Sequence, residues 1–150
     1  MRKIYDLRED TEHVNRLQKA TLTTKEFGLV PEHGLFGAAE WWSAVADGRI
    51  PVHTLEGRIS RVFLSGHNDW EEFEVESNGE HSSWNRVTSG GPGGSVERFE
   101  KAALYEVGRP VRLKYVRQRF RQEIQGLSFS KCVLEIWIGE HTSSANEASV

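Results

Sequence analysis

The dipeptide Asn78–Gly79 constrains the fold of this chain more than any other feature of its sequence. It lies between two runs in which apolar and polar residues alternate, WEEFEVES before it and EHSSWN after it. Asn-Gly between alternating runs predicts a β-hairpin closed by a two-residue type I′ turn. Such a turn pairs Ser77 with Glu80, so we expect Phe73 to lie opposite Trp84 as an aromatic pair on the core face.

The same register places a row of glutamates on the other face of the hairpin. These are Glu72, Glu74 and Glu76, which lie across from Asn85, Ser83 and His81. We expect this acidic row to be solvated and to repel nucleic acid.

Three further segments, residues 52–66, 109–118 and 131–139, have strand patterns. In the first, Gly57 interrupts the run, which a bulge or a sharp coil would explain. Leu55 and Ile59 fall on one face of the strand, whereas Val62 and Leu64 fall on the other. This change of phase predicts a strand that bends from one sheet of a barrel to another. In the second segment we expect inward residues at Val111, Leu113 and Tyr115, and in the third at Cys132, Leu134, Ile136 and Ile138.

A helix of about twelve residues is predicted before the 109–118 strand. Ser95 is a suitable N-cap and Gly108 a suitable C-terminal stop. The expected buried stripe consists of Phe99, Ala102, Ala103 and Tyr105.

The resulting order over residues 51–139 is β-β-β-α-β-β. With the glycine break, the tight hairpin and the helix before the fourth strand, this order resembles the OB-fold, a five-stranded Greek-key barrel. An SH3-like barrel is the nearest alternative, but the full helix favours the OB arrangement. The resemblance is one of architecture and implies no particular family.

Outside the barrel we expect a helical extension over residues 1–50, packed on the barrel, and a disordered tail over residues 140–150. Helices are predicted at 11–20 and at 36–47, the second ending at Gly48. Trp41 and Trp42 are adjacent and therefore about 100° apart around that helix. We expect one to pack on the barrel and the other to pack on its neighbour or to lie at a rim.

Charge is segregated along the chain. The formal net charge is −3, yet residues 109–131 hold seven basic side chains and one acid, so the remainder carries −9. We expect residues 117–129 to form a loop between the last two strands, with Arg beside an aromatic residue. The candidate contacts for a ligand or nucleic acid are Arg112, Lys114, Arg117, Arg119, Phe120, Arg121 and Lys131.

A single nucleic-acid strand suits these contacts, but so does a protein partner, and alternating Arg is also typical of the outer face of a strand. Possible interface residues elsewhere are Trp42, Trp137, His67 and Asp69. For Trp137 we expect cover from the N-terminal segment, with a role at a partner or dimer interface as the alternative. The glycine-rich stretch at 90–95 is read as a connector, since it lacks the ending of a phosphate-binding loop.

The remaining residues favour binding over catalysis. The six histidines have no metal-ligand spacing, and the single cysteine, Cys132, falls in an apolar strand pattern, so we expect no catalytic residues, no metal and no cofactor. The apolar runs are too short to cross a membrane, and the N-terminus lacks the apolar region of a secretory signal. We therefore expect a small cytoplasmic, bacterial, non-enzymatic interaction module that binds a protein partner or a second copy. Single-stranded nucleic acid is the alternative ligand, and a small-ligand-binding or catalytic barrel that uses His67 and Asp69 is a distant third.

Overall fold

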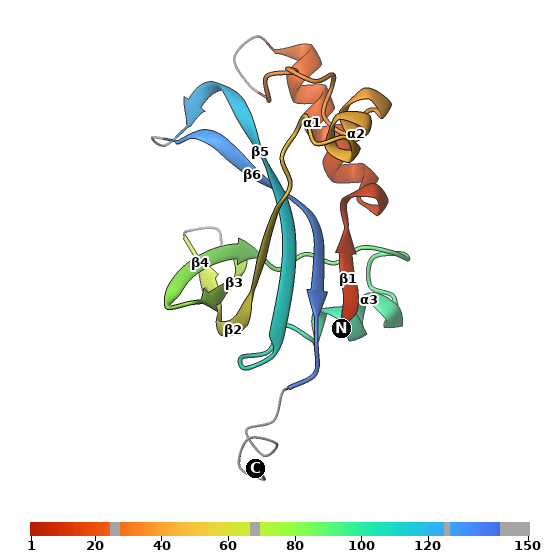
Figure 1. Cartoon of the computed structure of the whole chain (residues 1–150). Coiled ribbons are helices and arrows are strands. Elements are labelled where there is room, and N and C mark those ends of the chain that lie inside the picture. Colours follow the sequence, from red (N-terminus) through yellow and green to blue (C-terminus); the bar gives the residue numbers. More distant parts are fainter. Residues whose placement is uncertain (25–27, 67–69, 125–126, 142–150) are drawn as a thin grey trace. The chain divides into compact units, whose positions relative to one another are not determined.

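The computed structural model describes residues 1–24, 28–66, 70–124 and 127–141 (Figure 1). The protein is mainly β, as predicted. The strands are β1 (Arg2–Asp6), β2 (His53–Ser65), β3 (Trp70–Ser77), β4 (Glu80–Asn85), β5 (Pro110–Ile124) and β6 (Leu127–Ile138). The helices are η1 (Leu7–Glu9, a 3₁₀ turn), α1 (Thr11–Thr23), α2 (Ala39–Ala46) and α3 (Val96–Ala102).

The strands form one six-stranded sheet in the order β1-β6-β5-β2-β3-β4. β1 and β4 stand at the two ends of this order, and within the described ranges they do not pair with each other. A barrel requires its end strands to pair. The sheet is therefore open in this order, and the OB-like Greek-key barrel is not confirmed.

The chain divides into two compact units. The first comprises Met1–Asp6, Thr54–Leu113 and the chain from Glu135, and the second comprises Leu7–His53 and Lys114–Leu134. The predicted division into segments 1–50, 51–139 and 140–150 stays a prediction. Most of the proposed tail, residues 142–150, lies outside the described residues.

In the first unit the β3–β4 hairpin has the predicted register. Asn78 and Gly79 have φ values of 53° and 83°, the positive values that a type I′ turn requires. Ser77 pairs with Glu80, and Phe73 pairs with Trp84. Phe73 and Trp84 are buried, so the predicted aromatic pair lies on the core face.

The change of phase in β2 comes from a β-bulge. Ile59 pairs with Val75 and Arg61 with Glu74, which leaves Ser60 as an extra residue. One extra residue reverses the facing of everything after it, so β2 can present residues of both parities to one core. The prediction that β2 passes from one sheet of a barrel to another is therefore replaced by a bulge within a single sheet.

Gly57 has a different role from the bulge that its position suggested. A Cβ at residue 57 would lie 2.2 Å from the backbone carbonyl oxygen of Glu76 on the neighbouring strand. Backbone cannot move aside as the end of a long side chain can, so glycine is needed for the close approach of β2 to β3.

Helix α3 begins as predicted but ends early. The Ser95 hydroxyl accepts a hydrogen bond from the Arg98 N–H, which confirms the cap, while the last helical residue is Ala102 instead of a residue near Gly108. Tyr105 is buried as predicted, and its hydroxyl donates to the Val87 carbonyl.

The predicted buried stripe of α3 is wrong. Phe99 is 75 % exposed, and Ala102 and Ala103 are also exposed. The buried side chain is Lys101, whose Nζ donates to the Ser89 carbonyl at 2.5 Å. Ser89 is itself buried, and a buried carbonyl needs a donor, so the polar contact of Lys101 outweighs the apolar pattern in orienting this short helix.

The first residues of the chain form a strand, where a helical extension was predicted. β1 pairs antiparallel with β6, and Lys3 lies across from Trp137. Ile4 and Tyr5 are both buried, because a register shift between Lys3 and Tyr5 breaks the alternation. Without alternation this segment has no strand pattern in the sequence.

In the second unit both predicted helices are present. α1 is capped by the Asp10 side chain, which accepts from the His13 N–H. On α2, Trp41 is fully buried against Phe36 and donates through Nε1 to the Gln118 side chain at 3.1 Å. Trp42 is half-buried, and its ring packs edge-on against that of Trp41 with centres 4.8 Å apart. One tryptophan therefore packs inward and the other packs on its neighbour.

Cys132 on β6 is buried, as are the other three predicted inward residues of this strand. Burial raises the pKa of the Cys132 thiol to about 11. Only the thiolate reacts with alkylating agents or disulfide reagents.

Replacing Gly57 by Ala is expected to destabilise the protein by about 2 kcal/mol, since overpacking against fixed backbone costs about 1–3 kcal/mol. Gly93→Ala is the matched control, because a Cβ there would meet no atom within 4 Å. Urea unfolding of both variants measures the difference. Equal midpoints for the two variants would contradict the close approach of β2 and β3.

Cys132 is expected to react with a disulfide reagent at least about a hundredfold more slowly in the native protein than in denaturant at pH 8. With a pKa of about 11, about one native thiol in a thousand is ionised at that pH. Timed labelling followed by mass spectrometry gives both rates. Equal rates in the two states would show that Cys132 is accessible.

Candidate protein-binding face

The segment predicted as a basic loop is a pair of strands. β5 continues through Arg117 and Arg119 to Ile124, and β6 begins at Leu127. The loop prediction for residues 117–129 is therefore wrong. The physical reason is that the alternation of basic with apolar or amide side chains continues beyond residue 118, and a strand pairing with β6 uses that alternation.

One face of this β5–β6 hairpin carries aromatic and basic side chains together. The Arg119 guanidinium lies 6.0 Å from the centre of the Phe129 ring, and the Lys131 Nζ lies 5.9 Å from the Tyr115 ring. At the start of β2, His53 stacks on Tyr115 with ring centres 5.2 Å apart. We call this surface the basic–aromatic face, and its residues are His53, Tyr115, Arg117, Arg119, Phe129 and Lys131.

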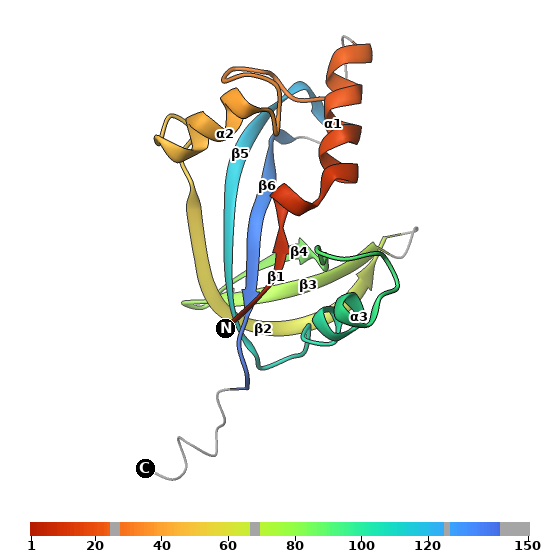
Figure 2. The same ribbon diagram turned by 90° about the vertical axis from the view of Figure 1, so that its right-hand side faces the viewer.

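The opposite face of the hairpin is already occupied. Val116 is fully buried, and Gln118 accepts the hydrogen bond from Trp41. Leu29 forms a β-bridge with Phe120. Figures 1 and 2 show α1 and α2 near the end of this hairpin. The second unit thus covers one face of the hairpin with its own residues.

Two predictions about this strand need correction. Phe120, predicted to stack on a base, is half-buried and falls on the face opposite Arg119. Tyr115, predicted to point inward, is half-buried on the basic–aromatic face, and Val116 is buried in its place. The buried residues of β5 alternate at Val111 and Leu113, but the next one is Val116, so the alternation is displaced by one residue. The exposed aromatic residue that sequence reasoning missed is Phe129, which is 49 % exposed.

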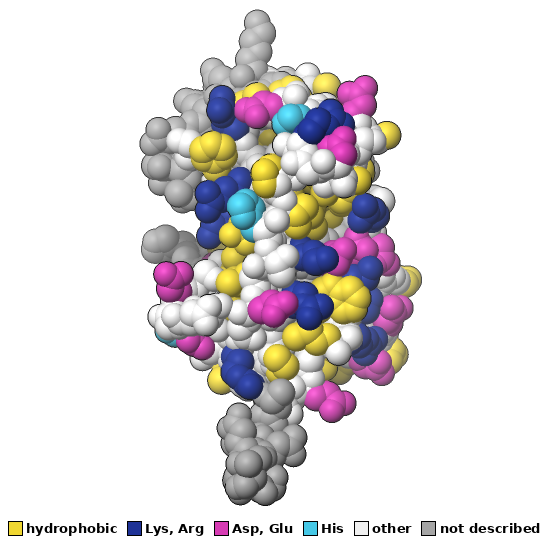
Figure 3. Space-filling view, viewed as in Figure 1, with side chains coloured by type: hydrophobic (Ala, Val, Ile, Leu, Met, Phe, Trp, Pro, Cys, Tyr) yellow, Lys and Arg dark blue, Asp and Glu magenta, His cyan; other side chains and the backbone are white. Residues whose placement is uncertain are grey.

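The basic side chains of the basic–aromatic face, Arg117, Arg119 and Lys131, are exposed to solvent. The ion pair that Arg119 makes is with Glu32, at 3.4 Å between two side chains that are each about half exposed. Exposed pairs of this kind contribute about 0–1 kcal/mol, so Arg119 remains available to a partner. Figure 3 shows basic side chains next to apolar ones over this part of β5 and β6.

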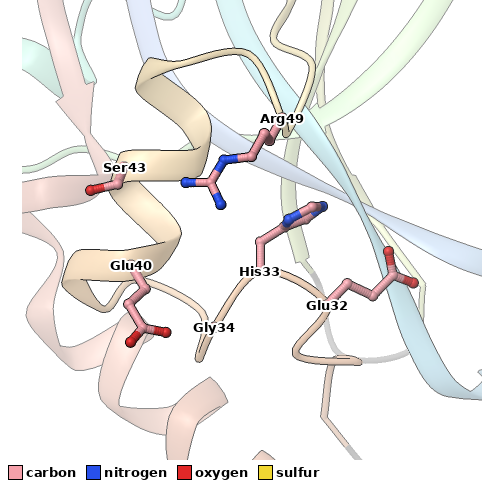
Figure 4. Close-up of a pocket in the computed structure, with 6 residues that line it drawn as sticks. All are labelled: Glu32, His33, Gly34, Glu40, Ser43 and Arg49. Atoms are coloured by element: carbon pink, nitrogen blue, oxygen red, sulfur yellow. The ribbon is translucent and has the colours of Figure 1, made fainter.

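A shallow polar depression of about 340 Å³ lies in the same unit (Figure 4). Its residues are Glu32, His33, Gly34, Glu40, Ser43 and Arg49. Arg49 is bound to Asp47 through a hydrogen-bonded ion pair at 2.9 Å, which lowers the pKa of the Asp47 carboxyl. Small-molecule sites are typically enclosed and largely apolar, so this open polar depression is a weak candidate for one.

The other predicted contacts lie elsewhere. Arg112 belongs to the first unit and makes an ion pair with Glu56 at 3.0 Å, and Lys114 is half-buried. The Arg121 side chain and both His67 and Asp69 fall outside the described residues. The structure therefore brings together Arg117, Arg119 and Lys131 of the predicted set.

The two predicted interface tryptophans are both partly covered. The Arg8 guanidinium lies 3.9 Å from the centre of the Trp42 ring. Trp137 is half-buried beneath the ammonium of Lys3, at 5.6 Å, so a residue of the N-terminal segment does cover it, as predicted. The tryptophan that sequence reasoning passed over is Trp70, which is 60 % exposed at the start of β3.

The predicted acidic row is only partly solvated. Glu72, Glu74 and Glu76 are of intermediate burial, and each carboxylate accepts a hydrogen bond from its own chain. The Ser60 hydroxyl, followed by His81, lowers the pKa of Glu74. The lowered pKa favours the ionised form of the Glu74 carboxyl.

Among the described residues, no group of three His, Cys, Asp or Glu side chains is placed to hold a metal ion. No helix in the described ranges is long and apolar enough to cross a membrane. Burial raises the pKa values of Cys132 and Tyr105, and these two residues belong to different units.

Comparison with known proteins gives one family. The family model of the RhsI2 immunity protein matches residues 1–139, which includes residues of both units. No curated protein sequence matches the chain. A match over that length is decisive, and the chain belongs to the RhsI2 immunity protein family.

Proposed function

We propose that this protein is an immunity protein that binds an Rhs toxin and inhibits it by occupancy, without turnover of its own. The family match over residues 1–139 is the observation that carries this proposal.

The basic–aromatic face is the surface that we assign to the toxin. Interfaces between proteins are enriched in aromatic residues and arginine, and binding energy concentrates in a few such residues. Phe129 and Tyr115 supply apolar area, while Arg117, Arg119 and Lys131 supply local positive charge in a chain whose formal net charge is −3. The toxin surface that complements this face is acidic.

The nucleic-acid interpretation receives no support from the family. Two structural corrections also weaken it, because Phe120 is not on the basic face and the contacts do not lie in a loop. The same charges would nevertheless attract phosphate, so binding to single-stranded RNA is the measurement that separates the two interpretations.

The basic–aromatic face is tested with a charge-reversed variant, Arg117→Glu/Arg119→Glu, and a purified Rhs toxin domain. We expect the Kd to rise at least about tenfold, since charged contacts at interfaces contribute about 1.4 kcal/mol or more. Titration calorimetry measures the affinity, and growth of toxin-expressing cells measures protection.

The matched control is Arg16→Glu/Lys19→Glu on α1, which changes the charge equally at two exposed residues of the same unit. It should bind like the wild type. An unchanged Kd in the Arg117/Arg119 variant would remove the face from the proposal, whereas failure of the wild type to bind any Rhs toxin domain would remove the function. Micromolar RNA binding by the wild type would restore the nucleic-acid interpretation.

A further inference from the structure

The two edge strands of the sheet, β1 and β4, differ in whether their outward backbone groups have hydrogen-bond partners. On β1, the Asp6 N–H donates to the Ser89 hydroxyl at 2.7 Å, and the Ile4 carbonyl accepts from the Ser89 N–H at 3.0 Å. Ser89 therefore covers the backbone of β1 on the side away from β6. On β4, no described residue makes a hydrogen bond to the backbone on the side away from β3, and Figure 1 shows β4 at the outer side of β3.

The hairpin register decides which backbone groups of β4 face that open side. In a hairpin closed by two residues, Ser77 and Glu80 form the first hydrogen-bonded pair. Hydrogen-bonded pairs recur at every second residue, so Glu80, Ser82 and Trp84 are bonded to β3. The bond from the Arg86 N–H to the Glu71 carbonyl, 3.0 Å, continues this series. The N–H and C=O groups of His81, Ser83 and Asn85 consequently point to the open side.

Of the features that protect an edge strand, the sequence of β4 has only a single acidic side chain, Glu80. Proteins prevent edge-to-edge pairing with proline, lysine, a bulge or a covering segment. The strand EHSSWN contains no proline or lysine, and its register with β3 is continuous from Glu80 to Asn85. An open, regular edge of this kind is a template for another strand.

We propose that the β4 edge pairs antiparallel with the β4 edge of a second copy of this chain. Centred on Ser83, the pairing is self-complementary, as a two-fold interface requires. Ser83 then faces Ser83, and His81 faces Asn85, so all three outward residues find a hydrogen-bonding partner. Glu80 falls across from Arg86, which places opposite charges together and leaves no like charges opposed.

This register is also the reason why we propose a second copy of the chain as the partner of the β4 edge. A second copy matches the edge in length, in hydrogen-bonding phase and in charge, all from residues of this chain. The pairing does not use the basic–aromatic face and does not depend on the toxin-binding proposal. Three outward residues in each strand give about six backbone hydrogen bonds across the two-fold axis.

The experiment is the mass of the full chain in solution, measured by light scattering after size exclusion and by sedimentation equilibrium from about 5 to about 200 µM. We expect twice the chain mass of 17.1 kDa at the upper concentrations. A mass of one chain throughout this range would overturn the proposal.

Two variants locate the interface. Ser83→Pro removes an N–H that the chain does not use, and proline is accepted at such positions of edge strands, so the variant should be a folded monomer. Ser83→Lys places two like charges face to face at the two-fold axis and should weaken the dimer at least tenfold. Asn15→Lys on α1 adds the same charge at an exposed residue and should leave the dimer unchanged.

Circular dichroism confirms that each variant is folded. If the dimer survives both Ser83 substitutions, the copies meet elsewhere and the β4 edge is not the interface. If the wild type is a monomer alone and an Rhs toxin domain instead protects the β4 amides from hydrogen exchange, the edge belongs to the toxin.

Discussion

The register of the β3–β4 hairpin is the constraint on which the first unit depends. Side chains alternate between faces with a period of two, so a slip of one residue would move Glu72, Glu74 and Glu76 into the core. The positive φ values at Asn78 and Gly79 prevent that slip. β2 must then present residues to the face that holds Phe73, and the extra residue at Ser60 allows it to do so.

The charge distribution of the second unit has a comparable origin. Trp41 is fixed by Phe36 and by the Gln118 side chain, so the face of β5 that carries Val116 and Gln118 is committed to the interior. Basic residues of the other parity therefore lie outside, where they meet the exposed Phe129. The basic–aromatic face is thus a consequence of packing as much as of the sequence of β5.

Elements with strong local chemistry were predicted correctly from the sequence. The hairpin pairs, the Ser95 cap and the buried residues of β6 each depend on neighbours within a few positions along the chain. Prediction failed where a distant group decided the outcome. Lys101 is buried because of the Ser89 carbonyl, and residues 2–6 form a strand because β6 lies beside them.

The sequence by itself therefore determined which residues of the hairpin and of β6 face the core. It also determined that basic residues are concentrated in residues 109–131. Only the tertiary structure decided that β4 ends the sheet, that the change of phase in β2 is a bulge, and that Phe129 and not Phe120 accompanies the arginines. Tight turns and the two-residue alternation of strand side chains depend on residues that are neighbours along the chain. A local sequence pattern can therefore reveal them. Pairing between distant strands depends on the free energy of contacts that no local pattern contains.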